Sequence, residues 1–261
     1  MPPLAITSYP VLGRQAYPAE YAHIISANDR LLDHACTLLA ALRLGLAPLP
    51  ELGEEAAAAG LPGLSAETLR SLLAAAGLLD AAGLPAPEPA RAFLEAERGA
   101  ALALLAHAWL QADTFNELRQ LPGLSAEGDW KNDPRRARQA VLDFLGGVPP
   151  ATWWSLPAFV TAVHQQSPDF QRPAGDYDSW FIRHQPSGEF LRGFEHWDEV
   201  DGALLRYLIC GPLHWLGGVD LASPSAEAPP AAFRLTAWAA DLLQGEVPEG
   251  FGAEDMTGLQ V

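Results

Sequence analysis

Histidines and carboxylates gather between Pro168 and Gly217, in a stretch that also holds much of the chain's aromatic content. It contains three of the eight tryptophans, three of the seven histidines and one of the two cysteines. Imidazole and carboxylate groups bind zinc or manganese and also serve general acid–base chemistry in hydrolases. The set that could do this comprises His184, His196 and His214 with Asp176, Asp178, Glu195 and Asp198. A metal-dependent hydrolase is therefore one hypothesis for this chain.

The spacing of these residues does not favour catalysis. The sequence has no HExxH or CxxC pattern, no GxSxG nucleophile elbow and no clustered Gly-rich phosphate loop. Histidines packed beside tryptophans, and aspartates paired with arginines, account for the same residue types without a metal. We therefore expect a protein that is not an enzyme, with no catalytic residues, no cofactor and no metal.

Only local clusters of basic residues indicate nucleic-acid binding. Acidic residues outnumber basic ones by 32 to 16, a formal net charge of −16, so general attraction to phosphate backbones or anionic lipid is not expected. The candidate nucleic-acid-binding residues are one basic cluster and three arginines set among aromatic residues: Lys131, Arg135, Arg136 and Arg138, then Arg172, Arg183 and Arg192. Arginines beside aromatic rings are also typical of cation–π packing and local ion pairs, which is the alternative.

Apolar residues in the same stretch point to a protein contact. The segments SWFIR and EFLRG flank QPSG, which predicts a β-hairpin with a four-residue turn within an insertion at residues 168–196. Trp180, Phe181 and Phe190 give this hairpin more apolar surface than it needs. That surface must be buried against its own domain or against a partner. These three residues form the candidate interaction surface.

Helical periodicity organises residues 28–98, after an arm over residues 1–27 that we expect to lie across this first domain. Three helices, a turn between two short segments and a closing helix are predicted at residues 28–45, 52–59, 65–77, 81–83 and 89–96. This is the element order of a winged-helix domain, a relative of the helix-turn-helix. An irregular helical bundle is the alternative.

The same order recurs over residues 133–245. Three helices, two wing strands and a closing helix are predicted there, with the hairpin inserted before the third helix. We therefore predict a mainly α fold with small β-wings, built as tandem winged-helix-like domains. A connecting helix and loop join them over residues 99–132, and residues 246–261 form a C-terminal tail.

The third helix of the second domain is acidic at its start. Asp198, Glu199 and Asp201 suit the positive end of a helix dipole but would repel DNA phosphates. Insertion of this helix into the major groove is therefore not expected, although the third helix is where such folds usually meet DNA.

With these residues laid out, the sequence resembles the helicase-associated domains of bacterial proteins, which are related to the N-terminal region of XPB-type DNA-repair helicases. The similar segments are Trp109 to Leu118, WKNDP, PDFQRP, GDYDSW, FLRGFEHW, GPLHWLG and FRLT, spread over Asn28 to Leu243. The resemblance implies tandem winged-helix-like units and an association with DNA processing, without a motif for catalysis. The absence of GxxxxGK[ST] excludes the ATP-hydrolysing part of a helicase.

Cellular context follows from what the sequence lacks. Cys36 and Cys210 fall in apolar helical patterns, which favours two buried, reduced thiols over a disulfide. No signal peptide and no membrane-length apolar run is visible, so a soluble, cytoplasmic protein is expected.

We therefore expect a non-enzymatic module that binds another protein or domain of a DNA-processing or helicase-associated assembly, with weak DNA contact at most. The first alternative is direct DNA binding through the Arg135–Arg138 cluster and the 168–192 hairpin. The second is the metal-dependent hydrolase.

Overall fold

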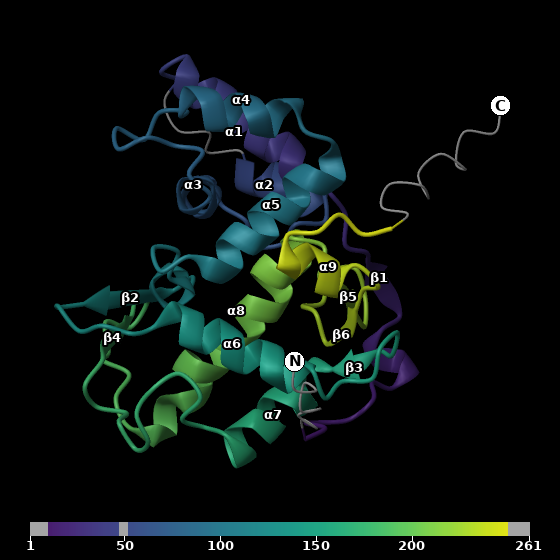
Figure 1. Ribbon diagram of the computed structural model, residues 1–261. Coiled ribbons are helices and arrows are strands. Elements are labelled where there is room, and N and C mark those ends of the chain that lie inside the picture. The colour runs from purple at the N-terminus through teal and green to yellow at the C-terminus, as the bar shows by residue number, and fades with distance from the viewer. Residues whose placement is uncertain (1–9, 47–51, 250–261) are drawn as a thin grey trace, which may run out of the picture.

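The computed structural model describes residues 10–46 and 52–249, and Figure 1 shows the helices of the first half grouped above the second half. The helices of the first half are α1 (Leu31–Arg43), α2 (Leu52–Ala58), α3 (Ala66–Ala75) and α4 (Pro87–Glu95). Ser65 caps α3, since its side chain accepts a hydrogen bond from the Thr68 backbone N–H. Leu79 and Pro85 form an antiparallel bridge across the predicted turn. The predicted element order of the first half is present.

One helix connects the two halves. Helix α5 (Arg98–Gln111) packs against α1 and α3 on the first half and against α6 and α9 on the second (Figure 1). The remaining helical elements are α6 (Pro134–Leu145), α7 (Leu156–Gln166), α8 (Ala203–Leu208), α9 (Ala239–Gln244) and the short turns η1 (Pro18–Glu20), η2 (Glu117–Gln120) and η3 (Phe194–His196). Pro134 occupies the first turn of α6, where its missing N–H costs nothing, and the Asp133 side chain caps the helix by accepting from the Arg136 backbone N–H.

A four-stranded antiparallel sheet lies beside α7 and α9, in the order β1-β5-β6-β3. Its strands are β1 (His23–Ile25), β5 (Val219–Ser223), β6 (Ala232–Leu235) and β3 (Trp154–Ser155). Strands β5 and β6 are the two predicted wing strands, paired with Leu221 opposite Phe233. The described chain is thus mainly helical with small antiparallel sheets, as expected.

The described part of the N-terminal arm, residues 10–27, pairs with the second half, so the expectation that it crosses the first domain is wrong. Strand β1 pairs with β5, with Ile24 opposite Ala222. Further back in the arm, the indole N–H of Trp154 donates to the Leu12 carbonyl at 2.7 Å. The arm satisfies an otherwise open strand edge, which favours this placement.

The predicted hairpin with its four-residue turn at residues 185–188 is present, but its strand pairing extends further than predicted. Strand β4 (Phe181–His184) turns back there: Arg183 and Phe190 form a bridge, the His184 N–H donates to the Glu189 carbonyl at 2.8 Å, and the Leu191 N–H donates to the Ile182 carbonyl at 2.9 Å. Its full partner is β2 (Leu124–Glu127), in a segment predicted to be a loop. A strand of four residues that pairs with a distant segment has too short an alternating pattern to be predicted from its own sequence.

The third helix of the second half lies at the centre of the molecule. Helix α8 is flanked by two π-helical segments, η4 (Asp198–Gly202) and η5 (Ile209–Leu213), and the backbone leaves the helical region at Gly211, directly before Pro212. The helix packs against α6 and α7, and Leu204, Leu205 and Leu208 are buried.

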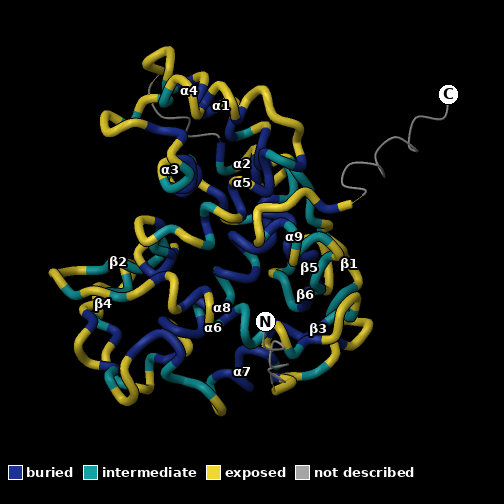
Figure 2. Tube along the Cα trace, in the orientation of Figure 1, coloured by how far each residue is buried: buried dark blue, intermediate teal, exposed yellow. Residues whose placement is uncertain are grey.

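A continuous core joins the two halves. Buried apolar side chains from α1 through α9 form one connected cluster, and Figure 2 shows exposed stretches in the outer loops and along α4. Two polar contacts also cross between the halves: Trp215 donates to the Pro62 carbonyl at 2.9 Å, and His214 Nε2 lies 2.7 Å from the Gly60 carbonyl.

Both cysteines are free, but they differ in burial. Cys36 is exposed, so the expectation that it is buried is wrong. Cys210 is partly buried, and desolvation raises the pKa of its thiol to about 12, which disfavours the reactive thiolate. Across the described segments, the helices lack the combination of length and apolar character that a bilayer crossing requires.

Candidate contact surface around β4

A stack of two tryptophans and two arginines supports the start of β4. The rings of Trp130 and Trp180 lie parallel with centroids 5.1 Å apart. The Arg119 guanidinium covers Trp130 at 4.5 Å, and that of Arg172 covers Trp180 at 4.3 Å. Trp180 is therefore buried and is not part of an interaction surface, contrary to the prediction. Trp130 covers it from the loop after β2, a pairing that sequence spacing does not reveal.

Arg172 is also buried and cannot serve as a nucleic-acid contact. Its guanidinium donates to both carboxylate oxygens of Asp201, at 2.9 and 3.2 Å, and to the Asp176 carbonyl at 3.0 Å. Burial raises the pKa of Asp201, while Arg172 and Gln171 oppose that shift. The pair fixes the insertion onto the start of the third helix.

Two phenylalanines and two arginines remain accessible on β4 and on the segment that returns after its turn. Phe181 is 41% exposed and meets the Phe190 ring edge-on at 6.1 Å. Arg192 lies over both rings, 4.3 Å from the Phe181 centroid and 5.6 Å from that of Phe190, while Arg183 covers Phe190 at 3.9 Å. We call Phe181, Phe190, Arg183 and Arg192 the Phe181 surface.

The two arginines of the Phe181 surface differ in whether an acidic side chain pairs with them. Arg183 pairs with Glu127 of β2 at 2.6 Å, and this ion pair lowers the pKa of Glu127. Arg192 is exposed and forms no ion pair with any residue in the described segments. A cation that already lies over aromatic rings, without a carboxylate neighbour, can bind a ligand. Sequence reasoning found this surface but missed Glu127, which belongs to the unpredicted strand.

The basic cluster at α6 is divided by burial. Arg138 is fully buried: its guanidinium pairs with Glu117 at 2.6 Å and donates to the carbonyls of Ala112 and Phe115. Arg138 therefore cannot contact nucleic acid, contrary to the prediction. Its guanidinium lies in the core, where the Glu117 carboxylate and two backbone carbonyls bind it. Lys131, Arg135 and Arg136 are exposed.

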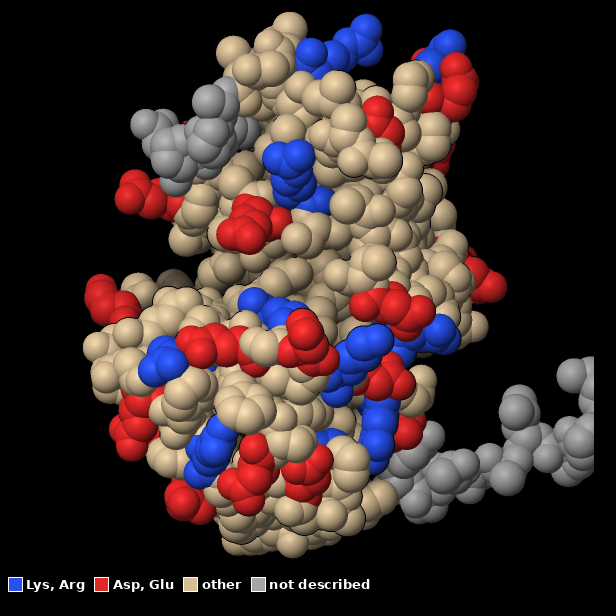
Figure 3. All heavy atoms as spheres, turned by 90° about the vertical axis from the view of Figure 1, so that its left-hand side faces the viewer, with Lys and Arg blue, Asp and Glu red and all other residues tan. Residues whose placement is uncertain are grey.

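The exposed part of this cluster is balanced by acidic groups. Arg135 and Arg136 line a cavity of about 370 Å³ together with Asp113 and Asp133, and Arg135 Nε lies 3.8 Å from Asp113. On the face that includes β2 and β4, Figure 3 shows basic and acidic side chains interleaved over the lower half, without a purely basic patch. Such a surface attracts phosphate backbones only weakly.

The histidines and carboxylates that suggested a metal site are dispersed. His214 is buried against the carbonyls of Val219 and Gly60, and burial lowers its pKa. His184 contacts Ser187, and His196 pairs with Glu199 at 2.7 Å. The described residues contain no group of three or more His, Cys, Asp or Glu side chains placed to hold a metal ion. The proposed hydrolase set is therefore not assembled by this fold.

The acidic residues of the third helix have partners within the chain. Asp198 pairs with Arg206 at 2.7 Å, while Glu199 and Asp201 bind His196 and Arg172. Since α8 itself is largely buried, this helix is not presented as a DNA-reading element.

Comparison of the chain with protein-family models, with curated proteins and with solved structures finds no match.

Proposed function

We propose that this chain is a non-enzymatic module of a DNA-processing or helicase-associated protein, acting mainly through contacts with another protein or domain. The family resemblance of the second half supports this proposal, as does the element order of both halves, which suits tandem winged-helix-like units. The buried, acidic third helix supports protein contact over major-groove reading.

The observation that carries the proposal is the Phe181 surface. Aromatic residues and arginine are the side chains most enriched in protein–protein interfaces. Arg192 is held over Phe181 and Phe190, so little side-chain freedom remains to be lost when a partner covers it. A partner with an acidic residue beside an apolar one fits this arrangement.

A capture experiment tests the proposal. The tagged wild-type chain should retain a DNA-processing protein from a bacterial extract, and the Phe181→Ala/Phe190→Ala variant should lose it. Leu104→Ala is a matched control, because Leu104 on α5 is 41% exposed, as Phe181 is, and lies outside the surface. Circular dichroism confirms that each variant is folded. Equal capture by all three chains, or capture of no DNA-processing protein, contradicts the proposal.

Direct DNA binding is the second candidate, carried by the exposed Lys131, Arg135 and Arg136. It predicts a gel shift with duplex DNA that weakens steeply as salt rises. Replacing all three residues with alanine should reduce the salt slope by about one for each phosphate that the variant no longer binds. Arg91→Ala, which removes an exposed arginine paired with Glu95 on α4, is the control. No shift at low salt rules out this function.

A further inference from the structure

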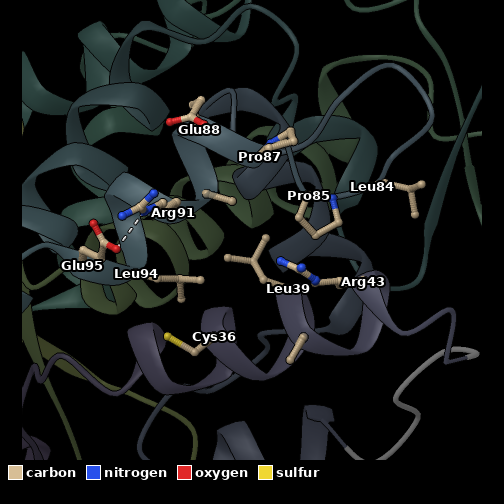
Figure 4. Close-up of a pocket in the computed structure, with 12 residues that line it drawn as sticks. Cys36, Leu39, Arg43, Leu84, Pro85, Pro87, Glu88, Arg91, Leu94 and Glu95 are labelled. Atoms are coloured by element: carbon tan, nitrogen blue, oxygen red, sulfur yellow. Dashed lines mark hydrogen bonds and ion pairs between the residues drawn. The ribbon is translucent and has the colours of Figure 1, made fainter.

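A groove of about 780 Å³ lies between α1 and α4, away from the Phe181 surface. Figure 4 shows Cys36, Leu39 and Arg43 of α1 facing it on one side and Leu94 of α4 on another, with Leu84 and Pro85 at one end. Its lining is mainly apolar, and it includes two large apolar side chains that are open to solvent: Leu84 is 48% and Leu94 52% exposed. An apolar groove with exposed leucines is a candidate binding site.

The α1 side of the groove has the form of a helix-packing hole. Cys36, Leu39, Ala40 and Arg43 follow the spacing i, i+3, i+4 and i+7, which places them on one face of the helix. Four residues on one helix face form the hole that receives a single side chain of a packed helix. The small residues Cys36 and Ala40 are exposed, so the hole is open.

The α4 side supplies a side chain of the type that fills such a hole. Leu94 projects beside the groove on an exposed turn of α4 (Figure 4). Leucine is the residue that most often acts as the knob in helix packing of this kind. One surface therefore contains both a hole and a knob, as a two-fold contact between identical chains requires.

The charge of the groove is balanced, so a second copy is not repelled there as it is elsewhere on the surface. The chain has a formal net charge of −16, so most of its surface repels another copy. The groove is an exception, because its lining holds Arg43 and Arg91 against Glu88 and Glu95. Within the described ranges, Arg43 has no ion-pair partner, whereas Glu95, beside the Leu94 knob, pairs with Arg91 at 2.8 Å and keeps its second carboxylate oxygen for a further cation. Inserting Leu94 into the hole brings Glu95 of one copy close to Arg43 of the other.

We propose that this groove is a homodimer interface, in which α4 of each copy packs into the groove of the other. Leu94 of one copy enters the hole formed by Cys36, Leu39, Ala40 and Arg43 of its partner. The two-fold symmetry repeats the contact in the opposite direction. The interface lies in the first half and leaves the Phe181 surface open for the function proposed above.

Sedimentation equilibrium of the full chain tests this interface. The wild type should form a dimer whose fraction rises with concentration, and Leu94→Glu should raise the dissociation constant more than about tenfold, because it places a charge in an apolar hole. Leu104→Glu makes the same chemical change at an exposed position of α5 and should leave the dimer intact.

A pair of complementary variants tests the knob and the hole together. Ala40→Arg alone should also prevent dimerisation, because it blocks the hole. Mixing Leu94→Glu with Ala40→Arg should restore a heterodimer, since one contact then pairs glutamate with arginine and the other keeps the native leucine and alanine.

Three results would overturn the proposal. The first is a wild-type monomer at the highest concentration reached, which leaves the groove to a different protein or to a small apolar ligand. The second is a dimer that Leu94→Glu does not weaken, which places the interface elsewhere. The third is a mixture of the two variants that stays monomeric although circular dichroism shows both folded.

Discussion

At the scale of single residues, two buried ion pairs organise the second half. Arg138 joins α6 to η2 through Glu117, and Arg172 joins the insertion to the third helix through Asp201. A buried pair contributes little net stability compared with apolar residues of the same shape, but removing one partner leaves the other charge uncompensated. Both arginines therefore act on folding and not on a ligand.

Replacing Arg138 with alanine should destabilise the fold by about 3–5 kcal/mol, because Glu117 and two carbonyls lose their donor. Urea denaturation measures this loss as a lower midpoint with an unchanged slope. The control is Arg135→Ala on the same helix, which removes an exposed guanidinium and should change stability by less than about 0.5 kcal/mol. Similar midpoints for the two variants would contradict the structural role of Arg138.

The sequence could predict that arginines would lie among aromatic rings, but not which of them face inward. Arg136 and Arg138 are two positions apart on α6, and only the second meets Glu117. Glu117 lies on a separate segment, so tertiary packing determines which of the two arginines is buried. For the same reason the sequence could not predict that Trp180 is buried, because the ring stacked on it, Trp130, lies on a separate segment.

At the scale of elements, periodicity predicted the helices better than the strands. The apolar stripes of α1, α3, α6 and α7 and their caps are local features, and each of these helices forms where its stripe lies. Strands β1 and β2 have three and four residues, and their partners lie far along the chain. Short strands of this kind carry too little alternation to be detected from sequence.

The turn before β5 offers a test of element packing. Gly217 has a φ of +81°, and a Cβ there would lie 2.9 Å from Leu242 of α9 and 3.4 Å from Leu102 of α5. Alanine should cost about 1–2 kcal/mol for the left-handed backbone and a further 1–3 kcal/mol, roughly, for the close approach to these side chains.

Gly45→Ala is the matched control for that substitution. Gly45 has a φ of +65°, and no described atom within 4 Å would meet its Cβ, so only the backbone cost applies. Thermal unfolding should show the larger decrease in midpoint for Gly217→Ala. Equal decreases would mean that the junction of α5, α9 and β5 can adjust to the added methyl group.

At the scale of the whole molecule, the N-terminal arm connects elements that the sequence places far apart. It adds β1 to the edge of β5, and near its start Leu12 and Arg14 contact β3. The first half is then held from two sides, by the arm before α1 and by α5 after α4. The sequence predicted the arm but not its position, because its contacts are mainly backbone hydrogen bonds and carry no residue signature.

Acid should release this arm. Glu20 accepts hydrogen bonds from Arg14, from Ser155 of β3 and from the Tyr17 backbone, and the Arg14 interaction lowers its pKa from 4.5 to about 2. A carboxyl group with a lowered folded-state pKa stabilises the fold fully above pH 4.5 and loses that contribution as the pH falls towards 2.

Amide hydrogen exchange can follow this release at Ala16, whose N–H donates to the Trp153 carbonyl at 2.8 Å. Its protection, corrected for intrinsic exchange and compared with the amides of α5, should fall between pH 4.5 and 2 in the wild type. Glu20→Gln should show reduced protection at neutral pH and little further change on acidification. Glu95→Gln, at an exposed pair on α4, should behave as the wild type. A wild-type arm that keeps its protection at pH 2 would show that the backbone pairing of β1 with β5 and of Gln15 with Trp154 of β3, and not the Glu20 carboxylate, holds it in place.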